Sequence, residues 1–246
     1  MPSPSRVLRT VKYAMYFNGV NNYIINRDFV WNVQQTGLTV GITLNTLKYS
    51  RNDWFSPVTS QTRIGRFMLQ HHGQYTGVFF LDVAGTVGGV SYIFSTRGKY
   101  SLNVFLNVFL TWDGSYFCWY VNGLLDNCQA DTRTDKGMAF IGYILGTSIF
   151  YAQGYVSQAL FYTRPLSVTE IQWNYQYPDN PVKDGLVLWL QADPAYVKDI
   201  DGDGIPEWID LSGYGNHGKI YGAQLVQLIK TPARLLPPNR VLASAR

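Results

Sequence analysis

The sequence predicts an all-β fold, an antiparallel two-sheet β-sandwich of the jelly-roll kind with one short helix. Three observations support this class. Short segments that alternate apolar and polar residues, or that are rich in β-branched and aromatic residues, recur along the chain. Clusters of Gly, Asn, Asp and Ser separate these segments, as is typical of sandwiches and barrels. The 246 residues include 18 Tyr, 13 Phe and 7 Trp, which is enough large side chains for a substantial core.

The expected strands are short and lie between turn signals. One of them, 103–111, places aliphatic residues at its even-numbered positions and mixes Asn with Phe at the odd-numbered ones. Because alternate residues face opposite sides of a sheet, the outer side of this strand is expected to be partly covered as well. The full set of expected strands is 14–17, 23–25, 38–44, 77–84, 90–94, 103–111, 116–121, 124–128, 138–142, 155–162, 186–190 and 219–222.

One helix is expected after residue 167. Ser167 precedes Glu170 by three residues, which is the spacing of a capping box. Ile171 and Tyr175 then fall four residues apart, on one helical face. Pro178 is expected to end the helix, because proline cannot continue the hydrogen-bonding pattern.

The chain is expected to hold one domain at 14–223, in which residues 185–223 supply a strand and a calcium loop. A basic arm at 1–13 precedes the domain, and a basic, apolar tail at 224–246 follows it. Of the net charge of +4, the arm carries +3 and the last 22 residues carry +4, which leaves the body acidic. Basic ends can contact nucleic acid, but solvated ends are the simpler interpretation, and nucleic acid is not an expected partner. No run of 18 apolar residues predicts a membrane span, and no secretory signal follows Met1.

Cys118 and Cys128 predict a cross-strand disulfide. Asn122-Gly123 lies between them and is a strong hairpin signal, since both residues tolerate positive φ. A three-residue loop starting at Asn122 would set the two cysteines directly opposite each other. Two buried free thiols are the alternative. A disulfide would indicate an extracellular or virion setting, or the cytosol of a hyperthermophile.

The segment 199–210 has the spacing of a calcium-binding loop. Its acids follow the pattern D-x-D-x-D-G, and further acids stand at positions 9 and 12. Calcium takes about six to eight oxygen ligands, and close carboxylates repel one another unless a hard cation neutralises them. Gly204 permits the sharp turn of such a loop. The predicted ligands of the calcium cofactor are Asp199, Asp201, Asp203, the backbone carbonyl of Ile205, Glu207 and Asp210.

The clustering of acids supports a metal site over a chance pattern. Six of the 16 acidic residues lie in 193–210. An acidic surface turn without a metal is the alternative. No flanking helices are expected, so the role of the ion would be structural, to hold a long loop in place.

Six segments together resemble a known family. They are AMYFNGVNNYI at 14–24, LTVGIT at 38–43, WYVNG at 119–123, GYVSQALFYTRPLSVTEI at 154–171, GLVLWL at 185–190 and DLSGYGNHG at 210–218. In combination they are similar to the laminin-G-like (LamG) branch of the concanavalin A-like lectin/glucanase superfamily. The resemblance implies a two-sheet jelly roll, often with bound calcium and often binding glycans or proteins.

The order of these segments departs from the family. The family's counterpart of 185–223 usually precedes its counterpart of 14–24, whereas here it comes last. The resemblance therefore implies a circularly shifted order, with the opening strand of the module at the C-terminal end. That strand either folds back onto its own chain or completes a neighbouring subunit, and both arrangements hide exposed sheet edges. We predict exchange between subunits, at least in part.

The sequence argues against catalysis. Glucanases of this superfamily use paired glutamates on one strand, and glycoside hydrolysis generally needs two carboxylates across the scissile bond. The chain has only two glutamates, Glu170 in the expected helix cap and Glu207 in the expected calcium loop. The G-x-S-x-G serine motif and the phosphate- and dinucleotide-binding glycine patterns are absent from the sequence.

Two non-catalytic functions remain. The first is a structural subunit of an extracellular filament or virion, which assembles with copies of itself by strand or tail exchange. The displaced strand, the disulfide and the calcium loop support it. The alternative is a carbohydrate-binding or adhesion module with a glycan partner, because sugar rings stack on exposed aromatic side chains. Trp54, Tyr75 and Tyr214, in apparent loops, are the candidate ligand contacts, and ordinary packing is their alternative role.

Overall fold

The computed structural model describes residues 11–33, 37–48, 52–59, 69–75, 78–87, 90–131, 138–147 and 151–228. The strands and helices, in chain order, are β1 (Tyr13–Asn18), β2 (Tyr23–Val33), β3 (Leu38–Thr46), β4 (Asn52–Thr59), β5 (Leu69–Tyr75), β6 (Val78–Val87), β7 (Val90–Ser95), β8 (Leu106–Trp112), β9 (Tyr116–Val121), β10 (Leu124–Ala130), β11 (Met138–Leu145), β12 (Gln153–Tyr162), α1 (Val168–Gln176), β13 (Leu186–Gln191), a 3₁₀ turn (Pro194–Tyr196), β14 (Val197–Lys198), β15 (Glu207–Trp208), β16 (Gly218–Tyr221) and β17 (Gln224–Gln227).

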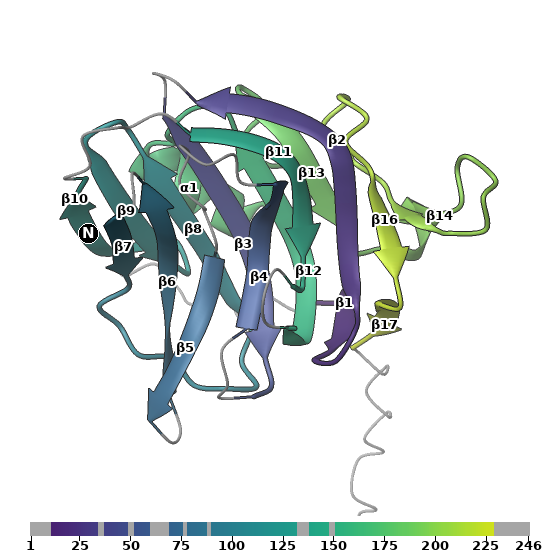
Figure 1. Ribbon diagram of the computed structural model, residues 1–246, viewed down its shortest axis with the longest axis horizontal. Coiled ribbons are helices and arrows are strands. Elements are labelled where there is room, and N and C mark those ends of the chain that lie inside the picture. Colours follow the sequence, from purple (N-terminus) through teal and green to yellow (C-terminus); the bar gives the residue numbers. More distant parts are fainter. Residues whose placement is uncertain are drawn as a thin grey trace, which may run out of the picture.

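The strands form two stacked antiparallel sheets (Figure 1). The first, here called sheet A, has the order β10-β9-β8-β3-β12-β1-β17, with β13 also paired to β12. The second, sheet B, has the order β14-β15-β16-β2-β11-β4-β5-β6-β7. The prediction of an antiparallel two-sheet β-sandwich is therefore confirmed.

The alternation in β8 shows how the core is built. Leu106, Val108 and Leu110 point between the sheets and are buried. Asn107 and Phe109 point to the outer side of sheet A, yet they too are buried, and Phe109 is completely inaccessible. The sequence pattern predicted a partly covered outer face for this strand, and the structure confirms it. The cover is the chain segment that includes α1.

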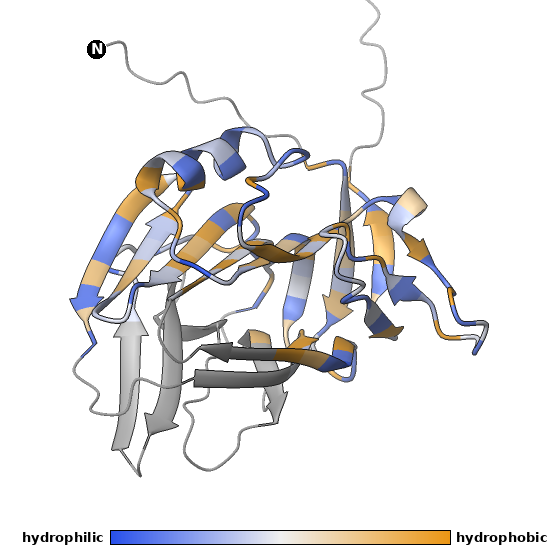
Figure 2. Ribbon diagram, turned by 90° about the horizontal axis from the view of Figure 1, so that it is seen from above, coloured by the Kyte–Doolittle hydropathy of each residue, from blue (hydrophilic) through white to orange (hydrophobic). Residues whose placement is uncertain are grey.

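Helix α1 lies on the outer side of sheet A (Figure 2). Ser167 is its N-cap, and Ser167 and Glu170 form both bonds of the predicted capping box. Arg164 donates to the Glu170 carboxylate, which lowers the pKa of that group to about 2. Ile171 is fully buried against sheet A. Among the described residues no helix is long and apolar enough to cross a membrane.

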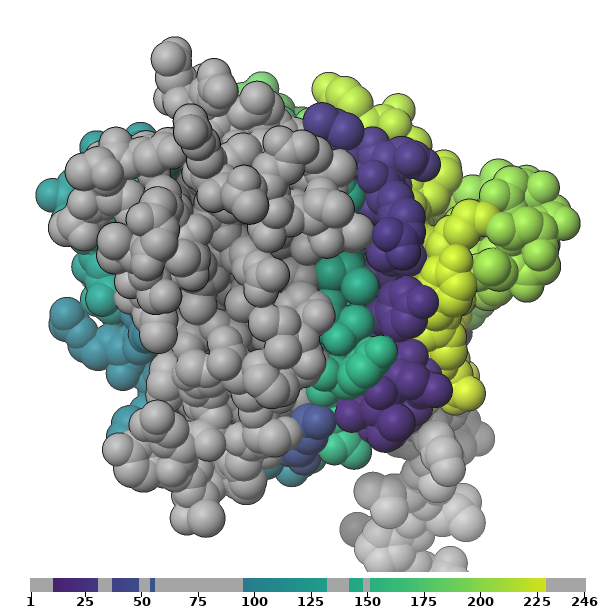
Figure 3. Space-filling view, in the orientation of Figure 1, coloured from purple at the N-terminus to yellow at the C-terminus, as the bar shows by residue number. Residues whose placement is uncertain are grey.

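The C-terminal segment completes the sandwich of its own chain. Strand β13 pairs with β12, β16 with β2, and β17 with β1. Figure 3 shows the C-terminal strands directly beside the first strands of the chain. The strands within residues 186–227 pair with their own chain here, and exchange with a neighbouring subunit stays a prediction. Strand β17 falls within the predicted tail at 224–246 and belongs to sheet A, while residues 229–246 lie outside the described residues.

Candidate functional site

The predicted calcium loop connects β14 to β15 at one edge of sheet B and projects from the body of the sandwich (Figures 1 and 3). Four of its acids meet there. One carboxylate oxygen from each of Asp199, Asp201, Asp203 and Glu207 lies within 4.8 Å of the others. The three aspartates are exposed, whereas Glu207 is buried at 5% exposure. The spacing of acids in the sequence therefore did identify side chains that converge in space.

Hydrogen bonds within the loop hold this arrangement. The two carboxylate oxygens of Asp199 accept from the backbone N–H groups of Gly202 and Gly204, at 2.8 and 2.9 Å. Glu207 Oε2 accepts from the N–H of Ile200 at 2.8 Å. Gly204 has a φ of +85°, a conformation that costs little only for glycine, as the predicted sharp turn requires.

Lys219 was missed by the sequence analysis, although it lies within the acidic cluster. Its Nζ is 2.8 Å from Asp201 Oδ2, contacts Asp203, and is 3.7 Å from Glu207 Oε1. Hydrogen bonds to Asp201 and then Asp203 raise the pKa of Lys219, and the bond from Lys219 lowers the pKa of Asp201. No local sequence pattern marks Lys219, because it reaches the acids through strand pairing, opposite Glu207 in the β15–β16 ladder.

Asp210 does not join the acidic cluster, contrary to the prediction. It is buried at 5% exposure, and its carboxylate accepts from the backbone N–H groups of Trp189, Ser212 and Asn216, and from the Ser212 hydroxyl. The physical reason is that β15 ends at Trp208 and Asp210 pairs with Leu190 of β13 through an isolated bridge. Its carboxylate is therefore held by these donors and not by the loop.

The donor set that remains fits a hard divalent cation. Four carboxylates converge, and the ammonium group of Lys219 forms an ion pair within their cluster. Calcium prefers oxygen ligands and accepts irregular geometry. Ile205 lies in the same loop, where its N–H donates to Asp203 at 2.8 Å. Calcium binding would place the ion in competition with Lys219 for the aspartate oxygens.

The three candidate ligand-binding aromatics have different environments. Trp54 is fully buried in β4, edge-to-face with Phe17 at 6.3 Å between ring centroids, so its prediction as a loop contact is wrong. Tyr75 is the last residue of β5 rather than a loop residue, and its side chain lies outside the described part of the chain. Tyr214 is 69% exposed in the loop after β15, as a ligand contact requires.

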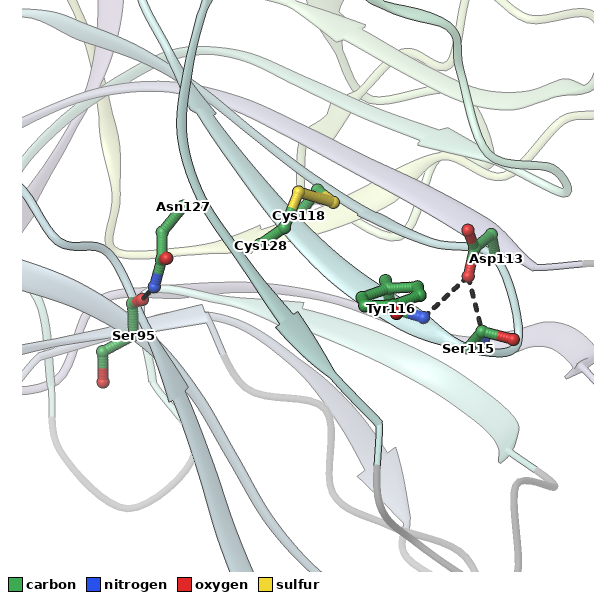
Figure 4. Close-up of a disulfide and its surroundings, with 7 residues drawn as sticks. All are labelled: Ser95, Asp113, Ser115, Tyr116, Cys118, Asn127 and Cys128. Carbon is green, nitrogen blue, oxygen red and sulfur yellow. Dashed lines mark hydrogen bonds between the residues drawn. A yellow bond between two sulfur atoms is a disulfide. The ribbon is translucent and has the colours of Figure 1, made fainter.

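The predicted disulfide between Cys118 and Cys128 is confirmed (Figure 4). The hairpin loop differs from the predicted three-residue loop. Its loop has two residues, Asn122 and Gly123, both with positive φ, and Val121 pairs with Leu124. A bulge between Leu125 and Asn127 then shifts the register by one residue, which sets the cysteines opposite each other.

The Cys118–Cys128 bridge is expected to contribute about 2–3 kcal/mol to stability, because it closes a short loop in the unfolded chain. A Cys118→Ala/Cys128→Ala double variant should lose this amount in urea unfolding. Reductant should destabilise the wild type but leave the double variant unchanged. Two reactive thiols in the unfolded, unreduced wild type would contradict the bridge.

Comparisons with known proteins identify the fold. No protein-family model matches the chain, and no curated protein matches it. Solved structures do match. A protein from Bacteroides ovatus described as a candidate carbohydrate-binding protein is 15% identical over 89% of this chain and 61% of its own, with a TM-score of 0.65. The heptameric SAP-like pentraxin of Limulus polyphemus is 15% identical over 69% of this chain and 84% of its own, with a TM-score of 0.54.

A third match is domain 4 of an extracellular GH43 arabinanase from Geobacillus stearothermophilus, solved in complex with arabinotriose. It is 15% identical over 65% of this chain and 74% of its own, with a TM-score of 0.51. These similarities agree with the two-sheet jelly-roll sandwich described above. At this level of identity they describe the fold alone.

Proposed function

We propose that this chain is a non-catalytic carbohydrate-binding module whose loop at 199–207 binds calcium. The observation that carries the proposal is the match of 89% of the chain to a candidate carbohydrate-binding protein. Domain 4 of the arabinanase, solved with arabinotriose, adds to it. Tyr214 exposes an aromatic ring on which a sugar can stack.

The involvement of both glutamates in structural contacts supports a role without catalysis. Glu170 pairs with Arg164 and caps α1, and Glu207 joins the acidic cluster. Glycoside hydrolysis generally needs two carboxylates on either side of the scissile bond. Neither of these carboxylates is free of structural hydrogen bonds.

We propose that Asp199, Asp201, Asp203 and Glu207 hold the calcium ion. When bound, the ion would neutralise carboxylates that otherwise repel one another. The loop would then gain stability from a ligand that binds only the folded state. The loop's own residues supply the turn and the hydrogen bonds that bring these acids together.

We further propose that the module is LamG-like, with a circularly shifted strand order. The two ends of the described sandwich support this, since Tyr13 pairs with Gln227 and the N–H of Leu228 donates to the carbonyl of Lys12 at 2.9 Å. Adjacent ends are the condition under which a chain can be permuted without changing its fold. The disulfide fits a secreted protein.

The alternative of a filament or virion subunit has less support. Its main argument was that the C-terminal strands would pair with another copy. Those strands, up to residue 227, pair with β1, β2 and β12 of their own chain. Carbohydrate binding is therefore the function we propose.

A panel of immobilised polysaccharides and oligosaccharides tests this function. The full chain, with calcium present, is expected to bind at least one neutral glycan and to release no reducing sugar from it. Competition by the same glycan in solution controls for nonspecific adsorption. No retention on any glycan of the panel would contradict carbohydrate binding, and steady release of reducing ends would contradict the non-catalytic role.

A further inference from the structure

A groove of about 440 Å³ lies between helix α1 and the chain that follows it. One wall is formed by Thr169, Glu170 and Trp173 of the helix, and the other by residues 180–183. Helix α1 lies on the outer side of sheet A (Figure 2), and its residues Thr169, Glu170 and Trp173 place the groove on that side. It is separate from the acidic loop, which belongs to an edge of sheet B.

An exposed tryptophan forms part of this groove. Trp173 is 44% exposed, and its indole N–H donates to the carbonyl of Asn180 at 2.9 Å. Its ring lies 4.4 Å from that of Tyr177, which is 49% exposed. The hydrogen bond and the neighbouring ring fix the orientation of the indole. A large apolar ring held in place at the surface has the features of a preorganised binding contact.

The charges around the groove favour a neutral ligand. Arg164 pairs with Glu170 at 2.6 Å and with Asp184 at 2.8 Å. Lys183, which also lines the groove, places its Nζ 3.7 Å from the centre of the Trp189 ring. Each of these charged groups already has a partner, so a charged ligand would have to displace one of them. A neutral ligand would meet the apolar ring together with hydroxyl and amide groups at the rim.

We propose that this groove binds a neutral sugar ring, with one face of the sugar stacked on Trp173 and its hydroxyl groups facing Thr169 and Asn180. A pyranose or furanose ring has an apolar C–H face and polar edges, which matches the aromatic face and the polar rim of the groove. The assignment rests on the proposed carbohydrate-binding function and names the surface that performs it.

The test uses the full chain and the neutral glycan that the panel retains. Trp173→Ala should weaken binding of that glycan by roughly tenfold or more, because a central tryptophan contact commonly contributes at least that much. Val168→Ala is the matched control, since Val168 is an exposed apolar residue on the same helix that does not line the groove. It should bind as the wild type does. Unchanged melting temperatures would show that neither substitution unfolds the helix.

A second variant fills the groove without removing Trp173. Thr169→Trp places a large side chain at an exposed groove position and should also abolish binding. Higher ionic strength should leave the wild-type affinity unchanged, because the ligand is neutral.

If the glycan binds the Trp173→Ala and Thr169→Trp variants as tightly as the wild type, the groove is not the site and the proposed function stands. If Tyr214→Ala alone removes binding, the groove is likewise not the site and the proposed function still stands. If the wild type retains no glycan, the proposed function fails together with this assignment.

Discussion

Trp54→Ala is expected to destabilise the protein by about 3–5 kcal/mol, the range typical of tryptophan truncation in a packed core. Trp54 is completely buried, and its ring packs edge-to-face against Phe17. The truncation leaves a cavity that neighbouring β-strands cannot close, because their positions are fixed by the sheet. The urea unfolding midpoint should fall while the slope of the transition stays the same.

Tyr214→Ala is the control for Trp54→Ala. Tyr214 is 69% exposed, so its truncation should change stability by no more than about 0.5 kcal/mol. Comparable stability of Trp54→Ala and the wild type would show that Trp54 is not a core residue, and would restore it as a candidate ligand contact.

Asp210→Ala is expected to cost about 2–4 kcal/mol, because hydrogen bonds to a charged group are worth about 1.5–3 kcal/mol each and do not add fully. The substitution leaves the backbone N–H groups of Trp189, Ser212 and Asn216 without their acceptor at partly buried positions. Asp210→Asn retains one acceptor oxygen and should cost less. Chemical unfolding measures both.

The loss in Asp210→Ala should be the same with calcium and with a chelator, because Asp210 lies outside the acidic cluster. Asp201→Ala is the matched comparison, and its effect should depend on calcium. A destabilisation of Asp210→Ala that disappears in chelator would mean that Asp210 is a metal ligand after all.

Much of the sandwich was predictable because its strands carry local signals. Strand β9 begins and ends where the alternation predicted it, and α1 begins at its capping box. Strand β4 was missed because it contains Pro57 and Asp53 and lacks a clear alternation. Strand β17 was assigned to the tail because its partner β1 lies at the other end of the sequence. Pairings that join distant segments leave little trace in local patterns.

The candidate site shows the same limit. Asp199, Asp201, Asp203 and Glu207 were found because loop ligands follow a local spacing. Lys219 was missed because it enters the cluster through strand pairing. The prediction for Trp54 failed because the packing of the two sheets determines whether this side chain is buried. The polar residues beside it in the sequence give no sign of that packing.

Lys219→Met is a second test of calcium binding by the acidic loop. Lys219 contacts three of the four acids, so its removal should tighten calcium binding while making the metal-free loop less stable. The two effects have opposite signs, and a single calorimetric titration paired with a melting curve in chelator separates them. Weaker calcium binding in Lys219→Met would contradict the arrangement.

The most direct test of the proposed metal centre is a calorimetric titration of calcium into the metal-free full chain. We expect one ion to bind per chain, and we expect calcium at about 100 times its dissociation constant to stabilise the fold by about 2.7 kcal/mol. Asp201→Ala should abolish both the heat of binding and the rise in melting temperature. A wild-type chain that shows no binding heat and the same melting curve with calcium and with chelator would contradict a calcium site in the 199–207 loop.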